Sequence, residues 1–452
     1  MKPIRLSARR VFIISDLHLG GTAPTMMTSA DQLKQLIASL PARRARDERL
    51  ELVIAGDFVD FLAVPPFAAF TANPPEACDK LQRTMQDAAF GVVFDALGKL
   101  VAAGHRLVVL LGNHDVELAF PSVQDALLKR LGATQHDVQF VQDNSAYRVG
   151  ALLVEHGNRY DGANENDWTG LRAMVSALSR GEAPIDEFEV SAGSRLVETL
   201  VSPLKSRYPF VDLLQPQGEL LALLIVAFEP SLILDFPKLG KLLKAKRLQD
   251  KNPRGLQPGE TRHVAFAQTT HKDPELDRAF GAAYATLRLP NEQVGAWDVL
   301  RAAWDAREDS LSEILDRGED VPLDRLEQIR VVMRHLLLAD KSAARDGDTE
   351  QYGAAARRMI DSSGDAITTV VMGHTHLARH IGPAERASYI NTGTWADVIR
   401  VPAALLDEGH HHELQGFLTG LRRGEGRTCP GTYADVRVEA DGRVSAARLL
   451  PE

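Results

Sequence analysis

The sequence predicts an α/β fold that is interrupted by a large, mainly helical insertion, and three observations support this. Short apolar runs alternate with helical patterns over the first 160 residues. Another such run follows residue 365, and between these two parts the chain changes to helices and polar linkers. Each apolar run stops abruptly at glycine, serine or glutamate and is followed by Asp, Asn or His. Apolar runs bounded in this way are typical of buried parallel strands, which place functional residues at their carboxyl ends.

The pattern of the first 160 residues predicts strands that alternate with helices. Pro41 ends the first helical pattern, and a second helical pattern closes at Gly104. In chain order, the expected elements are a strand at Val11–Ser15, a helix at Ser29–Leu40, a strand at Leu50–Ala55, a helix at Cys78–Ala103, a strand at Val108–Leu111, a helix at Gln124–Leu131 and two or three short strands within Val138–Val154. This alternation favours a parallel arrangement of the strands.

Strand character returns near the end of the chain. Further strands are expected at Thr368–Met372 and Ala387–Ile390, and an Asp441-Gly442 turn between two apolar stretches predicts a C-terminal hairpin. We therefore expect three parts: residues 1–160 as the first part of a catalytic core, residues 161–355 as a helical insertion or cap, and residues 356–452 as the second part of the core.

Composition excludes several classes of protein. The chain has 452 residues, 44% hydrophobic and 25% charged residues, and a formal net charge of -9, which makes nucleic acid an unfavourable partner. Its two cysteines, Cys78 and Cys429, support neither a disulfide framework nor a structural zinc site. We therefore expect a protein of the reducing cytoplasm. The longest apolar run, Leu220–Phe228, is much shorter than the ~20 residues of a membrane-spanning helix.

The residues that follow the predicted strands share one chemistry, which is that of a metal site. They are Asp16, His18, Asp57, Asn113, His156, His374 and His376. One such residue alone is more often a cap or a turn residue, but five separate junctions of this kind are not explained that way. Oxygen and imidazole ligands without thiolate suit Mn²⁺, Fe or Zn²⁺ better than Mg²⁺ alone. Seven side chains are too many for one ion, whereas two ions ~3.5–4 Å apart that share a carboxylate account for them.

The spacing of these residues resembles a known family. Asp16-x-His18, Gly56-Asp57-x-x-Asp60, Gly112-Asn113-His114-Asp115, His156 and Gly373-His374-x-His376 follow the signature blocks of the calcineurin-like metallophosphoesterase superfamily in order. The resemblance covers about residues 10–160 and 365–395 and leaves the insertion out. It implies a four-layer αββα sandwich, in which two mixed sheets are flanked by helices.

The resemblance also implies roles for these residues. One metal would be held by Asp16, His18, Asp57 and His376, and the other by Asp57, Asn113, His156 and His374. A hydroxide between the two ions would attack the phosphoryl group, with Mn²⁺ as the expected metal and Fe or Zn²⁺ as alternatives. His114 would face the phosphoryl group, either as a transition-state stabiliser or as the proton donor to the leaving oxygen, and Asp115 would orient the His114 ring. Asp60 fits either a helix cap or a contact behind the ligands.

Two further stretches are candidates for substrate contact. Arg159 follows His156 closely and would suit a phosphate oxygen, with a structural salt bridge as the alternative, and Asn113 and His114 complete the expected substrate contacts. Residues 194–250 combine apolar helical faces with a basic run, which would suit an amphiphilic phosphoester or peripheral docking on an anionic membrane. That basic run consists of Lys238, Lys241, Lys244, Lys246 and Arg247. A helical cap with a solvated basic face is the favoured alternative.

The expected activity is hydrolysis of a phosphomonoester, phosphodiester or pyrophosphate bond in an amphiphilic or nucleotide-like substrate. The motifs are also similar to those of UDP-2,3-diacylglucosamine hydrolases, but this chain has His114 where that family commonly has arginine, and its insertion is much longer. The alternatives are a nuclease of the related DNA-repair type and a non-catalytic scaffold with the same fold. The sequence predicts no oligomeric state.

Overall fold

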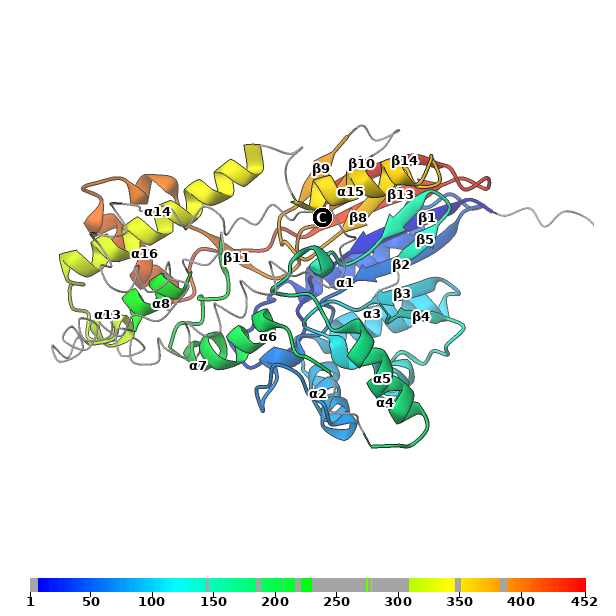
Figure 1. Cartoon of the computed structure of the whole chain (residues 1–452), viewed down its shortest axis with the longest axis horizontal. Coiled ribbons are helices and arrows are strands. Elements are labelled where there is room, and N and C mark those ends of the chain that lie inside the picture. The colour runs from blue at the N-terminus through cyan, green and yellow to red at the C-terminus, as the bar shows by residue number, and fades with distance from the viewer. Residues whose placement is uncertain are drawn as a thin grey trace, which may run out of the picture. The chain divides into compact units, whose positions relative to one another are not determined.

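The computed structural model describes residues 7–143, 146–183, 188–205, 207–215, 221–229, 309–345, 351–382 and 388–452, together with residues 274 and 278 (Figure 1). The chain forms two compact units, each of which is described by itself. Unit 1 comprises Met1–Glu198, Gln351–Asp397 and Cys429–Glu452, and unit 2 comprises Thr199–Glu350 and Val398–Thr428. Unit 2 thus includes a C-terminal segment that the sequence-based division assigns to the core.

Unit 1 contains a six-stranded mixed sheet with the strand order β14-β13-β1-β2-β3-β4. The strands are β1 (Arg9–Ile14), β2 (Arg49–Ala55), β3 (Arg106–Leu110), β4 (Val138–Val141), β13 (Thr432–Val438) and β14 (Val444–Pro451). β1 to β4 run parallel, while β13 pairs antiparallel with both β1 and β14. The predicted C-terminal hairpin therefore forms one edge of this sheet.

A second, five-stranded sheet in unit 1 has the order β5-β6-β8-β10-β9. Its strands are β5 (Tyr147–Val149), β6 (Leu152–Val154), β8 (Thr369–Met372), β9 (Arg379–Ile381) and β10 (Ser388–Asn391). β6 pairs parallel with β8, and β8 pairs parallel with β10. The β6–β8 ladder joins the two parts of the core that are separated in sequence.

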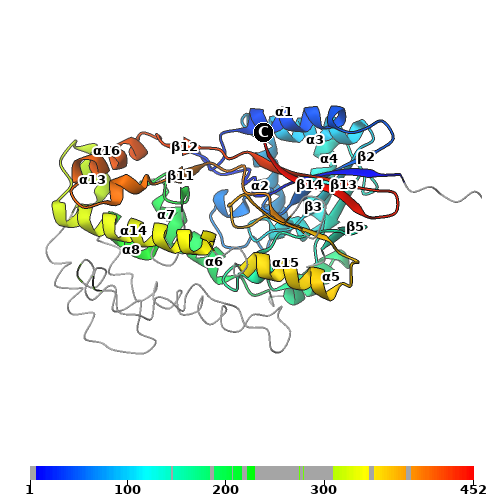
Figure 2. The same ribbon diagram turned by 90° about the horizontal axis from the view of Figure 1, so that it is seen from above.

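The two sheets pack against each other, and helices cover their outer faces. Successive residues of a strand point to opposite faces, so Val11 and Ile13 of β1 lie in the core between the sheets, together with Val371 of the second sheet. Phe12 and Ile14 face the helices instead. Figure 2 shows α1 and α3 on one side of the sheets and α15 on the other. The predicted four-layer fold is confirmed.

The helices of unit 1 are α1 (Ala30–Ser39), α2 (Pro74–Gln86), α3 (Gly91–Ala102), α4 (Pro121–Leu131), α5 (Trp168–Ser179), α6 (Ala192–Leu196) and α15 (Gln351–Ser362), with short 3₁₀ turns η1 (Leu40–Arg43), η2 (Phe61–Ala63), η3 (Val116–Ala119) and η4 (Asn158–Tyr160). The single helix predicted at Cys78–Ala103 is wrong, because the chain turns between α2 and α3. There the Asp87 carboxylate accepts the backbone N–H of Ala89 at 2.8 Å, a local bond that competes with helix formation.

Unit 2 is mainly helical, as expected for the insertion. Its helices are α7 (Ser202–Leu204), α8 (Leu221–Phe228), α13 (Leu311–Asp316), α14 (Leu323–Arg345), η8 (Ala403–Leu406) and α16 (His411–Arg422). A small sheet contains β7 (Leu214–Gln215), β11 (Val398–Arg400) and β12 (Arg427–Thr428). A π-helical turn, η5 (Val197–Val201), includes the residues at which unit 1 ends and unit 2 begins in the chain. Arg330 of α14 is buried and donates to the carbonyl oxygen of Leu406 at 2.9 Å. The basic run at 238–247 lies outside the described residues. In the part of the chain that is described, no helix is both long and apolar enough to cross a membrane.

Candidate metal centre

The predicted ligands come together in unit 1 at the carboxyl ends of parallel strands from both sheets. Asp16 follows β1, Asp57 follows β2 and Asn113 follows β3, while His156 follows β6 and His374 follows β8. In parallel sheets these ends meet at one edge, which is the usual place for a site in an α/β protein. The sequence-predicted junctions are therefore neighbours in space.

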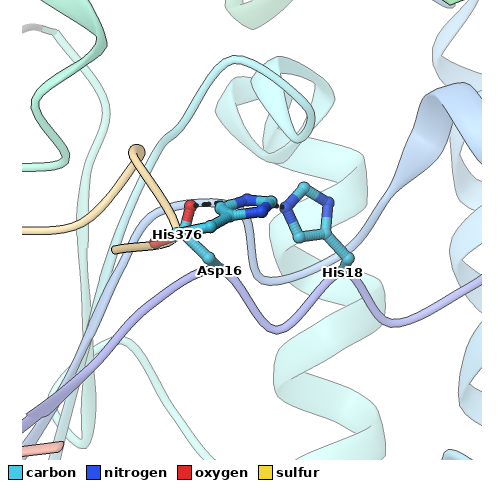
Figure 3. Close-up of side chains that lie close together, drawn as sticks. All are labelled: Asp16, His18 and His376. Carbon is cyan, nitrogen blue, oxygen red and sulfur yellow. Dashed lines mark hydrogen bonds and ion pairs between the residues drawn. The ribbon is translucent and has the colours of Figure 1, made fainter. Parts of the chain in front are cut away.

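A first group joins the two distant parts of the chain. Asp16, His18 and His376 offer ligand atoms that all lie within 4.8 Å of one another. Figure 3 shows the rings of His18 and His376 pointing toward each other, with Asp16 beside them. The Nε2 atoms of the two rings are 3.0 Å apart, and Nε2 of His376 lies 3.4 Å from Oδ1 of Asp16. Two imidazoles and a carboxylate converging in this way form a donor set that fits a divalent cation.

A second group is formed by Asp57, His156 and His374, whose ligand atoms also lie within 4.8 Å of one another. Oδ2 of Asp57 is 3.4 Å from Nε2 of His156, and Oδ1 of Asn113 is 3.3 Å from that same nitrogen. Nδ1 of His156 lies 2.8 Å from the carbonyl oxygen of Ala55, which can only accept a hydrogen bond. Nδ1 is thereby the donor to this carbonyl, and Nε2 is the nitrogen that a metal would bind after losing its proton.

Asp57 connects the two groups. Its Oδ2 atom lies 3.7 Å from Nε2 of His18 in addition to its contact with His156. Gly112 allows this carboxylate to approach the end of β3, because a Cβ atom at that position would lie 2.0 Å from Oδ1 of Asp57. Asp57 is therefore the carboxylate that lies near the histidines of both groups.

Strained backbone conformations gather at this centre. Among the described residues, six non-glycine residues have a positive φ angle. Five of them are predicted ligands: Asp16, His18, Asp57, His374 and His376. Each such residue costs about 1–3 kcal/mol and persists only where the surrounding structure holds it, which is common at functional sites. The backbone thus supports a functional role independently of the side chains.

The charges of the centre favour a cation. Burial alone would raise the pKa of Asp57, but the neighbouring His156 and His114 hold it well below the ordinary value of an aspartate. Burial alone would lower the pKa of His156, but the carboxylates of Asp57 and Asp16 raise it to about 10. Buried carboxylates that are stabilised by positive neighbours are suited to a bound metal ion, which supplies positive charge directly.

Asp60 contacts two histidines of the candidate metal centre. Its Oδ2 atom is 3.4 Å from Nδ1 of His18, and its Oδ1 atom is 3.2 Å from Nδ1 of His114. The same carboxylate accepts the backbone N–H of Ala63 at 3.1 Å and so caps η2. Asp60 thus fills both of the roles that the sequence left open. An ionised carboxylate only accepts hydrogen bonds, so Nδ1 of each ring is the donor to Asp60.

The prediction that Asp115 orients the His114 ring is wrong. Oδ1 of Asp115 accepts the N–H of Gly112 at 2.6 Å, and its Oδ2 accepts the N–H of Phe58 at 2.7 Å. Both oxygens are therefore used to tie together the chain segments that follow β2 and β3. Burial and the nearby Asp57 charge raise the pKa of Asp115 to about 7. Asp115 supports the backbone of the site, whereas Asp60 contacts the ring.

The sequence interpretation missed two residues that follow His156. Oδ2 of Asp161 lies 3.2 Å from Nε2 of His374, and Nδ2 of Asn166 donates to the carbonyl oxygen of Gly112 at 2.8 Å. Both belong to a stretch rich in Asn and Asp that begins at Asn158. That density of short polar side chains directly after a predicted ligand is the signal that could have indicated them.

Arg159 lies in a structural ion pair. Its Nη1 atom is 3.6 Å from Oε2 of Glu155, and its guanidinium carbon is 5.4 Å from the centre of the Tyr160 ring. The side chain is 29% exposed. The structure therefore shows the salt bridge that the sequence offered as an alternative, and the predicted phosphate contact of Arg159 stays a prediction.

One of the comparisons with known proteins, that with protein families, bears on the resemblance. Residues 9–188 match the calcineurin-like phosphoesterase family, which confirms the resemblance read from the sequence. Comparison with curated proteins gives no match. Among solved structures, the chain is similar to a phosphopantetheinyl hydrolase from Mycobacterium tuberculosis, with 11% sequence identity, a TM-score of 0.23, and coverage of 86% of this chain and 91% of that chain.

Proposed function

We propose, from the match of residues 9–188 to the calcineurin-like phosphoesterase family, that this chain is a metal-dependent phosphohydrolase with two metal sites. The observation that carries the proposal is the pair of ligand groups joined through Asp57. The first site would use Asp16, His18, Asp57 and His376, and the second Asp57, Asn113, His156 and His374. Two divalent ions bound there would activate water and neutralise the charge of a phosphoryl group. Mn²⁺ is the proposed metal, with Fe and Zn²⁺ as alternatives.

His114 is proposed to act on the leaving group. Its backbone N–H donates to Oδ1 of Asp57 at 2.9 Å, and its Nδ1 faces Asp60, so the position and the tilt of the ring are both fixed. Nε2 is then the atom that can hold a proton for the leaving oxygen, and the side chain is 18% exposed to solvent. A ring that is held in this way is prepared for general acid catalysis.

The substrate is proposed to be a phosphomonoester, a phosphodiester or a pyrophosphate. Asn113, beside the second site, and Arg159, three residues after His156, are its proposed phosphate contacts. A planar guanidinium can bind two phosphate oxygens at once, and Arg159 would exchange its Glu155 partner for them. A non-catalytic scaffold would not need the complete set of ligand side chains that lies here, so catalysis is the better-supported alternative.

Metal dependence tests the proposed function. Chelator-stripped protein is expected to hydrolyse neither p-nitrophenyl phosphate nor bis-p-nitrophenyl phosphate, and added Mn²⁺ should restore hydrolysis of at least one of them, as measured by release of nitrophenolate. The Asp57→Asn variant, purified in the same way, reports any contaminating phosphatase. Absence of metal-dependent turnover on these compounds and on a broader set of phosphoesters would refute the enzyme assignment.

Asp161 is proposed to position His374 toward the second metal site. A carboxylate that accepts the Nε2 proton leaves the lone pair on Nδ1 and holds the ring in place. The Asp161→Asn variant is therefore expected to bind Mn²⁺ about 10-fold more weakly at one of two sites, as measured by calorimetric titration of the stripped chain.

The matched control for this variant is Asp125→Asn, since Asp125 is exposed on α4. The control should bind Mn²⁺ like the wild type. If Asp161→Asn also binds Mn²⁺ with unchanged affinity at both sites, Asp161 does not support a metal ligand.

A further inference from the structure

A charged pocket lies in unit 1 at the edge of the sheet opposite to the candidate metal centre. It has a volume of about 430 Å³ and lies at the amino ends of β1 to β4. Its charged lining includes Arg9, Arg44, Arg49, Arg106, Glu48, Glu51 and Asp137. We call it the arginine pocket. Its volume is within the range of about 300–1,000 Å³ that small-molecule sites usually have.

Strand register places arginines next to one another at this pocket. Arg9 of β1 is the cross-strand partner of Arg49 of β2, and Glu51 is the partner of Arg106 of β3. Arg49 and Glu51 are two residues apart on one strand, so all four side chains leave the same face of the sheet. Like charges at neighbouring positions repel, and a bound anion would relieve that repulsion.

The carboxylates of the pocket already have partners. Glu51 pairs with Arg9 at 2.6 Å, and Glu48 pairs with Arg437 at 2.9 Å. Asp137 accepts the backbone N–H of Thr134 at 2.9 Å and its hydroxyl at 2.7 Å. These acidic groups are therefore committed to other contacts.

Three guanidinium groups are left without a carboxylate. Within the described ranges, no ion pair is formed by Arg44, Arg49 or Arg106. Arg106 instead donates to the neutral side chain of Gln139. Arg44 donates from Nη1 to the carbonyl oxygen of Glu48 at 2.8 Å, while its Nε atom is buried and has no hydrogen-bond partner. A buried donor without an acceptor is costly, so the hydrogen-bonding capacity of the Arg44 guanidinium is not fully used by its backbone contacts.

We propose that the arginine pocket binds a small anion with a diphosphate group, at a site separate from the metal centre. A diphosphate carries roughly three negative charges, which matches the three unmatched guanidiniums. Arginine is the side chain best suited to phosphate, because its fork of N–H groups binds two oxygens at once. The pocket gathers positive charge in a chain whose net charge is -9. This proposal does not depend on the proposed hydrolase activity.

The test is calorimetric titration of the full, metal-stripped chain with inorganic pyrophosphate. The double variant Arg49→Gln/Arg106→Gln removes two charges from exposed positions and should weaken binding by at least about tenfold. Arg9 is kept, because its loss would leave the buried Glu51 without its cation. The matched control is Arg172→Gln/Arg448→Gln, which removes two exposed arginines elsewhere in unit 1 and should bind like the wild type.

Thermal unfolding checks that the double variant is folded, and the single variants Arg49→Gln and Arg106→Gln should each give part of the loss. Equal affinity of the wild type and the double variant would overturn the proposal, as would no binding at millimolar pyrophosphate. A loss of affinity in Asp57→Asn with none in the double variant would place the anion at the metal centre and would also overturn it.

Discussion

Asp57→Asn is expected to reduce phosphoester hydrolysis by about 1,000-fold and to lower the metal content from two ions to one or none. Asp57 is the carboxylate that lies 3.7 Å from Nε2 of His18 and 3.4 Å from Nε2 of His156, and so it reaches both ligand groups. Asparagine has the same shape but no charge, and a neutral amide oxygen is a weak bridge between two cations. The loss of activity should therefore follow the loss of metal.

Metal content is measured by elemental analysis of the protein after equilibration with Mn²⁺, and activity is assayed in parallel. Asp125→Asn, which removes the charge of an exposed aspartate on α4, should retain both the metals and the rate. Full metal content in Asp57→Asn would show that Asp57 does not bridge, and the assignment of the two sites would have to be changed.

His114→Ala is expected to lower kcat by about 100- to 10,000-fold while both metals stay bound. Nδ1 of His114 lies 3.2 Å from Oδ1 of Asp60, so this carboxylate holds the ring. Removing the ring takes away the proton donor for the leaving oxygen and leaves the proposed ligands in place. A substrate with a good leaving group, such as a nitrophenolate, should lose less rate than an alkyl phosphoester.

The matched control for this variant is His412→Ala, since His412 is exposed on α16. Metal content again decides the outcome, because His114 also has a ring nitrogen within 4.8 Å of ligand atoms of His18 and Asp57. Loss of one metal ion in His114→Ala would identify the residue as a ligand and would contradict its proposed role in proton transfer.

The sequence predicted the strands and the ligand groups because both depend on local signals. An apolar run identifies a buried strand, and the polar residue after it marks the carboxyl end, as at Asp16, Asp57 and His374. Parallel pairing then brings these ends together without any further information. The four layers were implied by the resemblance to the calcineurin-like family, and the C-terminal hairpin was predicted from the Asp441-Gly442 turn.

The features that the sequence did not predict depend on the directions of side chains and on local hydrogen bonds that compete with regular structure. Asp115 is next to His114 in the chain, and Asp60 is next to it in space. Which carboxylate contacts the His114 ring depends on the course of the folded backbone. At the break between α2 and α3, the Asp87 carboxylate accepts the N–H of Ala89, and the helical pattern of the sequence does not indicate this bond. Asp161 lies in an irregular stretch, where no periodic pattern exists to indicate its contact with His374.

The ligand groups combine side chains from two segments that lie far apart in the sequence. This limits which fragments of the protein can contain the whole centre. A fragment that ends at residue 188 contains the whole family-matched segment but lacks His374 and His376, one proposed ligand of each metal. The β6–β8 ladder brings these histidines close to Asp16 and His156. The covalent connection between Glu198 and Gln351 is not needed for that contact. The smallest piece that contains all the proposed ligands is thus a two-segment assembly, and limited proteolysis within the insertion is expected to yield two peptides that remain associated.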